Sequence, residues 1–231
     1  LGRLVLHKAQ GVPLLPAADG TARLRPADAV VVPGLEGAAD PPSLGRLVVG
    51  LVHRAWWRLD ALRRLGVRER PLADLVDEMA GLDLEPTGWR ELYAALDGSD
   101  VEALGALPVP LADGRVVRGP RGALVPESAV TSATWDPLTR LGVRIVHPDA
   151  AHPLLARLGA QPGTPAGLLR HPVTRQAVQD GDEVTDVVLT LVDSSGLTTD
   201  DEPWLGELLL TDVDGRRRPA GPAEAGRQPE D

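Results

Sequence analysis

Histidines are the side chains of this chain best suited to binding a metal or transferring a proton. His147 and His152 lie five positions apart with Pro148 between them, so a helix would place their rings on different faces, and the His-Glu-x-x-His pattern of a zinc site is missing. His147, His152 and His171 each precede a proline, as residues at helix starts do. The sequence therefore predicts no metal site and places these histidines in loops or helix caps.

Two groups of carboxylates are the next candidates, because paired carboxylates can act as general acid and base. Each group lies in a loop before an apolar run, where solvation and the dipole of a following helix stabilise negative charge without a catalytic role. A structural role is the main interpretation, and acid–base catalysis is the alternative. The groups are Asp180, Asp182 and Glu183, and Asp200, Asp201 and Glu202.

A glycine-rich stretch from Gly114 to Gly122 is similar to phosphate-binding loops only in composition. It lacks the Lys-Ser/Thr pair of a P-loop, and Pro120 removes an amide that would contact a phosphate. We therefore predict a hairpin and turn here. Nucleophilic catalysis has no support either, because no Gly-x-Ser-x-Gly context surrounds Ser99, Ser128, Ser132, Ser194 or Ser195.

The overall composition excludes several other classes of protein. The 231 residues carry a net charge of −9 with scattered basic residues, which disfavours nucleic-acid binding. There is no cysteine, hence no disulfide, thiolate zinc site or cysteine nucleophile, in keeping with a cytoplasmic location. No apolar run reaches the length of a membrane span, so we expect no membrane contact. The chain opens on Leu1, and we expect an internal or truncated piece of a larger protein.

The elements that would position these side chains follow an internal repeat. A Gly-x8-Gly frame ending in Asp-Gly occurs at 11–20, 105–114 and 206–215, and a Leu-Gly pair comes 46 residues after the first Asp-Gly and 45 after the second. We therefore predict an α+β fold built as a tandem repeat of about 94 residues, each a β-hairpin followed by several helices. The predicted domains are a first repeat over 1–100, a second over 101–198, and the start of a third with a frayed tail over 199–231.

Glycines mark the ends of the predicted elements. Asp-Gly pairs between β-prone runs predict hairpin turns at Gly20, Gly114 and Gly215, since glycine accepts a positive φ. Gly66 and Gly159 follow apolar helical runs, which predicts helix C-caps. The predicted hairpins pair 12–15 with 22–24, 109–111 with 115–118, and 207–211 with 216–218.

Helical periodicity is strongest over 44–65, where apolar residues recur with i, i+3, i+4 spacing. We predict one long helix there, with Ser43 as its N-cap and with Trp56 and Trp57 on different sides. One of these rings should enter the core, and Trp57 is the candidate for contact with a neighbouring domain; core packing alone is the favoured interpretation of the pair. Further helices are predicted over 72–80, 89–96, 136–142, 149–158, 174–179 and 183–192, with another starting at Thr164-Pro165, and strands over 29–32, 123–125 and 143–146.

Three phrases of the sequence look like one known family. VPLLPAADG at 12–20 continuing to RPAD at 25–28, HPDAAHPLLARLGA at 147–160 and WLGELLL at 204–210 resemble the region downstream of the ATPase domain in bacterial sacsin-like proteins. These are large chains whose N-terminal domain is similar to that of heat-shock-90-type chaperones. Their ATP site uses an asparagine-bearing helix, and this chain has no asparagine. The resemblance therefore implies that the nucleotide site lies elsewhere in the parent protein and that this segment holds no cofactor.

We therefore expect a non-catalytic segment of a chaperone-related ATP-binding protein, serving inter-domain coupling or client-protein contact. The expected partners are other domains of the same parent chain and client proteins. Two alternatives stay open, a stand-alone acid–base enzyme using loop carboxylates and histidines, and a peptide-binding module that offers a hairpin edge. An open edge is disfavoured because proline interrupts the row of amides that a partner strand would use, and the hairpin flanks contain Pro13, Pro16, Pro108 and Pro110.

Overall fold

The structure is a computed structural model, and it describes residues 11–39, 41–57, 60–127, 131–180, 184–211, 214 and 216–220. These residues form a mixed α+β fold whose sheets have two strands each. The chain divides into two compact units, one comprising Leu1–Gly122 with His147–Ala160, the other Ala123–Val146 with Gln161–Asp231. This division by contacts does not follow the predicted repeat boundaries at 100 and 198.

The first unit contains two antiparallel hairpins, β1 with β2 and β5 with β6, and one parallel pair, β3 with β4. Its elements in chain order are β1 (Leu15–Pro16), β2 (Arg23–Leu24), the 3-10 helix η1 (Pro26–Asp28), β3 (Val30–Val31), α2 (Pro41–Leu47), η2 (Arg54–Trp56), α3 (Asp60–Arg64), β4 (Arg68–Glu69), α4 (Leu72–Met79), α5 (Pro86–Leu96), η3 (Ala103–Ala106), β5 (Pro108–Pro110), β6 (Val116–Arg118), η4 (Pro148–Ala150) and α7 (Pro153–Arg157).

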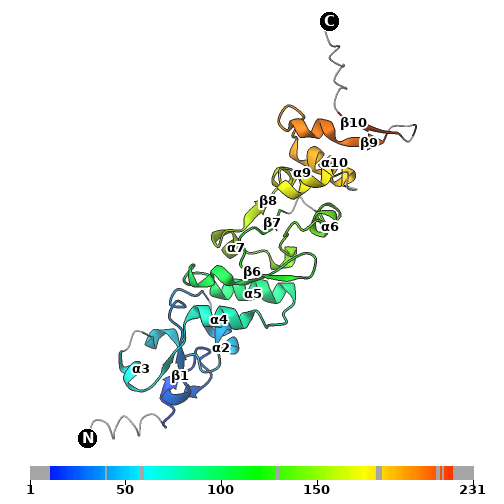
Figure 1. Cartoon of the computed structure of the whole chain (residues 1–231). Coiled ribbons are helices and arrows are strands. Elements are labelled where there is room, and N and C mark those ends of the chain that lie inside the picture. Colours follow the sequence, from blue (N-terminus) through cyan, green and yellow to red (C-terminus); the bar gives the residue numbers. More distant parts are fainter. Residues whose placement is uncertain are drawn as a thin grey trace. The chain divides into compact units, whose positions relative to one another are not determined.

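The second unit contains the parallel pair β7 with β8 and the antiparallel hairpin β9 with β10, each pair lying side by side in Figure 1. Helix α10 packs against α8 and α6. The elements are β7 (Leu124–Pro126), α6 (Ser132–Arg140), β8 (Gln161–Gly163), α8 (Pro165–Leu169), α9 (Pro172–Gln179), α10 (Thr185–Ser195), η5 (Pro203–Glu207), β9 (Leu209–Thr211) and β10 (Arg217–Pro219).

All three predicted hairpins form, and the first two share one turn chemistry. The Oδ1 of Asp19 accepts the amide of Thr21 at 3.0 Å, and the Oδ1 of Asp113 accepts the amide of Arg115 at the same distance. These side-chain bonds stabilise the turn locally. The glycine after each aspartate has a positive φ, +71° at Gly20 and +83° at Gly114, as the turn requires. Gly215 lies outside the described residues.

Parallel strand pairing is the feature of the fold that the sequence did not predict. In the first unit, the amide of Val52 bonds the carbonyl of Val30 at 3.0 Å. In the second unit, the amide of Val146 bonds the carbonyl of Leu124 at 2.9 Å, with both partners shifted by 94 residues. β4 pairs with β3, and β8 with β7, beside these bonds. Each segment after a hairpin is therefore held by contacts between residues far apart in sequence.

The prediction of one helix over 44–65 is wrong, although Leu44 and Val48 are buried as its pattern requires. α2 ends at Leu47, and the chain then turns at Gly50, whose φ is +83°. A Cβ on Gly50 would lie 2.3 Å from the carbonyl oxygen of Asp28, so the backbones meet too closely for a continuing helix. Ser43, the predicted N-cap, lies inside α2.

Over the residues of the predicted second repeat, three more element predictions need correction. α6 begins at Ser132, four residues before the predicted start, and includes Pro137 in its interior. The predicted helix over 149–158 is two short helices, η4 and α7, because His152 is extended between them with φ −148°. The predicted strand over 143–146 is reduced to bridge residues at Ile145 and Val146, with Ile145 paired to Leu124. The helices predicted over 72–80, 89–96, 174–179 and 183–192 correspond to α4, α5, α9 and α10.

Candidate interaction surface

The four histidines that the structure describes lie at helix starts, and all four bind the backbone in one way. In each case Nδ1 accepts the amide two residues further on, at 3.2 or 3.3 Å, and so caps the following helix. The helix-cap prediction is confirmed for His147, His152 and His171. His53 was missed, although it stands 94 residues before His147, at the spacing of the predicted repeat. Within the described ranges, no three His, Asp or Glu side chains are placed to hold a metal ion.

Two of these caps are expected to make stability depend on pH. Burial lowers the pKa of His152 and of His171; around His152, Arg90 and Arg157 also lower the pKa while Asp97 raises it. Because each folded-state pKa lies below the ordinary value of about 6.5, the unfolded chain binds protons first as the pH falls. The stabilisation is therefore complete above about pH 6.5 and is lost as the pH falls through the folded-state values. Urea denaturation at pH 7.5 and 5.5 should show a lower free energy of unfolding at pH 5.5.

The matched control replaces both titrating caps by serine, as His152→Ser with His171→Ser. Serine offers a capping oxygen that does not titrate in this range, so the difference between the two pH values should shrink. The carboxyl groups of Asp201 and Glu202 contribute little to this difference, because their pKa is lowered from an ordinary value near 4, well below pH 5.5. An equal free energy of unfolding at both pH values in the unmodified chain would contradict the capping role.

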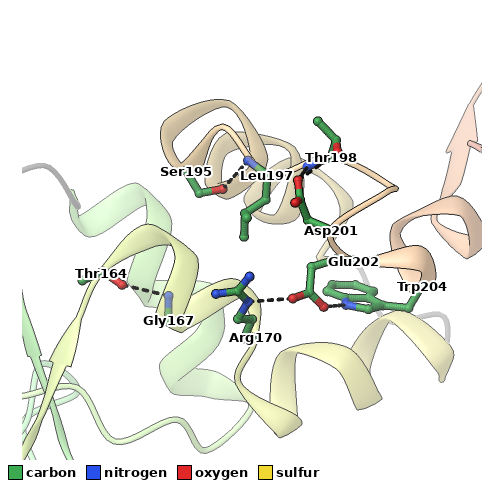
Figure 2. A network of polar contacts seen from close by, with 9 residues as sticks. All are labelled: Thr164, Gly167, Arg170, Ser195, Leu197, Thr198, Asp201, Glu202 and Trp204. Atoms are coloured by element: carbon green, nitrogen blue, oxygen red, sulfur yellow. Dashed lines mark hydrogen bonds and ion pairs between the residues drawn. The ribbon is translucent and has the colours of Figure 1, made fainter.

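Two members of the second acidic group, Asp201 and Glu202, belong to a structural network (Figure 2), and Asp200 precedes them as an exposed residue. The Nε of Arg170 donates to the Oε1 of Glu202 at 2.6 Å, and the Nε1 of Trp204 donates to the Oε2 of the same residue at 3.0 Å. The Oδ2 of Asp201 accepts both the amide and the hydroxyl of Thr198. These bonds lower the pKa of both carboxyl groups, which holds them as ionised acceptors. Of the other acidic group, Asp182 and Glu183 lie outside the described residues.

Trp57 is not the freely exposed member of the tryptophan pair. Its ring is half-buried against the core cluster that includes Leu15, Val52 and Leu62, and its Nε1 donates to the carbonyl of Val52 at 2.6 Å. Trp56, at the end of η2, is 38% exposed. The two rings lie in and just after a 3-10 helix, which orients them differently from the predicted α-helix.

The two glycines predicted to end helices have the backbone conformation that such caps need. Gly66 follows α3 with φ +84°, and Gly159 follows α7 with φ +105°. The amide of Gly66 bonds the carbonyl of Arg63, and the amide of Gly159 bonds that of Ala156. The two helix ends therefore have the same local geometry.

A groove in the first unit is the best candidate for contact with another protein. It has a volume of about 560 Å³ and lies between α2 and α5. Its lining includes the apolar Leu47, Leu84 and Leu92 together with one cation, Arg46, and one anion, Glu91. Leu47 is 39% exposed there, whereas Leu92 is buried. A groove of this size with few charges suits apolar side chains better than a phosphate or a metal.

Comparisons with known protein families, with curated proteins and with solved structures find no match for this chain. Across the described part of the chain, no helix has both the length and the apolar character needed to cross a membrane.

Proposed function

We propose that this chain is a non-catalytic, tandem-repeat segment of a sacsin-like, chaperone-related ATP-binding protein of the cytoplasm. It contacts other domains of its parent chain or client proteins, and it holds no cofactor of its own. The observation that carries the proposal is a backbone frame that occurs twice. The amide of His53 bonds the carbonyl of Pro16 at 2.9 Å, and the amide of His147 bonds that of Pro110 at 2.9 Å, both partners being 94 residues further on.

Further bonds of the frame recur at nearly the same spacing and support the proposal. The amides of Arg68 and Gln161, 93 residues apart, bond the carbonyls of Ala29 and Ala123 at 3.1 and 3.0 Å. The aspartate turns and the histidine caps repeat as well. The turns and caps use the aspartate and histidine side chains that acid–base catalysis would need. This use favours a scaffold over a catalytic role. Repeat proteins of this kind act through their surfaces, and the groove between α2 and α5 offers one.

An aggregation assay tests the proposal. The chain, added to a chemically unfolded client protein, should slow the client's aggregation equally with and without ATP and magnesium, and calorimetric titration with ATP and magnesium should show no binding. Leu47→Glu puts a charge into the groove and should abolish the effect. Leu189→Glu, at a 44% exposed leucine of α10 in the other unit, is the matched control and should retain it. Micromolar ATP binding, or equal activity of both variants, would contradict the proposal.

A further inference from the structure

The outer edge of strand β9 differs from the corresponding edges of the two earlier hairpins. In the first unit, the carbonyls of Pro16 in β1 and Pro110 in β5 each accept the amide of a histidine that follows an apolar segment. The first of these segments also pairs with the hairpin edge through an antiparallel bridge between Ala17 and Val52. Two hairpins of this chain are therefore extended at the same edge by a segment of the same type.

Thr211 occupies the same position in the third hairpin as Pro110 occupies in the second. Val109 faces Val117 in the second hairpin as Leu210 faces Arg218 in the third. The flanking bonds also correspond, since the amide of Gly119 bonds the carbonyl of Leu107 and that of Ala220 bonds the carbonyl of Leu208. Carbonyl directions alternate along an antiparallel ladder, so the carbonyl of Thr211, like that of Pro110, points away from the partner strand.

Within the described residues, the apolar strand of the third hairpin is less buried at its central position than the corresponding strands of the two earlier hairpins. The central residue is buried in both earlier hairpins, with Leu15 1% and Val109 0% exposed, whereas Leu210 is half-buried. The preceding residue is exposed in the third hairpin, as it is in the first, with Leu209 37% and Leu14 41% exposed. Among the hydrogen bonds between described residues, none joins the Thr211 carbonyl to a donor outside this hairpin. β9 also contains no proline, so amides are present at Leu209 and Thr211 where β5 has prolines. A strand with a full row of amides and exposed apolar side chains is suited to strand addition.

We propose that the outer edge of β9 binds an extended apolar segment ending in a histidine N-cap, of the type formed by Leu51–His53 and Ile145–His147, supplied by a further unit of this kind. The inference rests on the proposed repeat. The occupant's histidine amide donates to the Thr211 carbonyl, and its apolar side chains cover the β9 strand. A second copy of this chain is not the occupant, because in each copy both histidines already donate to Pro16 and Pro110.

Thiol labelling tests this inference directly, because the chain contains no cysteine. Leu210→Cys is made in the full chain and in a graft whose residues 221–231 are replaced by a copy of residues 120–160, the segment that follows the second hairpin. Linking the segment to the hairpin raises its effective concentration. The graft should react with a maleimide at least tenfold more slowly than the ungrafted chain. A graft whose copied segment carries His147→Pro lacks the donor amide and should react at the ungrafted rate.

Two reference variants separate failure of this inference from failure of the proposed function. Val109→Cys reports a strand that is already covered, and Val49→Cys reports a side chain that is 87% exposed. If Val109→Cys reacts as fast as Val49→Cys, the repeated frame fails, and the proposed function with it. In the other case, Val109→Cys is protected, while Leu210→Cys reacts at the same rate in both grafts and in the ungrafted chain mixed with an excess of a synthetic 120–160 peptide. Only the β9 inference is then overturned. Protection that rises with concentration of the ungrafted chain would assign the edge to a second copy and overturn it too.

Discussion

Gly50→Ala is expected to lower the free energy of unfolding by about 3–4 kcal/mol, a large effect for the addition of one methyl group. Two costs combine at this position. The φ of +83° is strained for any residue with a Cβ, and the new Cβ would lie 2.3 Å from the carbonyl oxygen of Asp28. That carbonyl cannot easily move, because the next residues are fixed by bonds such as that from the Val30 amide to the Gly50 carbonyl at 2.8 Å. Urea denaturation measures the loss.

Gly114→Ala is the matched control, because its φ is also +83° while no atom lies within 4 Å of the added Cβ. It should cost only the backbone strain, about 1 kcal/mol. The difference between the two variants isolates the close approach at Asp28. Equal losses would mean that the turn at Gly50 can relax, and that backbone crowding is not what prevents a continuous helix from Leu44 to Leu65.

The same position explains why the long helix could not be rejected from the sequence. Apolar spacing over 44–65 fits a helix, but Leu51 and Val52 are buried for another reason, since they form bridges with Val30 and Ala17. Strand partners that are 21 and 35 residues away leave no periodic signal in a local window. The hairpins were predictable because an Asp-Gly turn and both of its strands lie within about a dozen residues.

The helix caps were predictable to the extent that a local signal marks them. Histidine before proline indicated three of the four capping histidines, and Thr164 before Pro165 indicated another cap, whose Oγ1 accepts the amide of Gly167 at 2.9 Å. His53 precedes Arg54, so only the repeat spacing could have found it. The orientation of the Trp57 ring could not be predicted for the same reason as the end of the helix, because it follows from the turn at Gly50 that precedes it.

Tyr93→Ala is expected to destabilise the first unit by about 3–5 kcal/mol, the usual cost of removing a large buried aromatic ring. Tyr93 is 0% exposed in α5, with ring centroids 6.2 Å from Trp89 and 6.5 Å from His152. Its hydroxyl donates to the carbonyl of Pro108 at 2.7 Å and so attaches the helix to the second hairpin. Tyr93→Phe keeps the ring and leaves that buried carbonyl without its donor, which should cost about 1–3 kcal/mol.

The hydroxyl contribution should not change with pH, because burial raises the pKa of Tyr93 far above its ordinary value. The difference in free energy of unfolding between Tyr93→Phe and the unmodified chain should therefore be the same at pH 7 and pH 9. Trp56→Ala is the control for loss of an exposed ring and should stay within about 0.5 kcal/mol of the unmodified chain. If Tyr93→Phe proved neutral, the bond to Pro108 would not hold the second hairpin on α5. The hairpin would then depend on burial of Val109 and Leu111 and on the His147 amide at its opposite end.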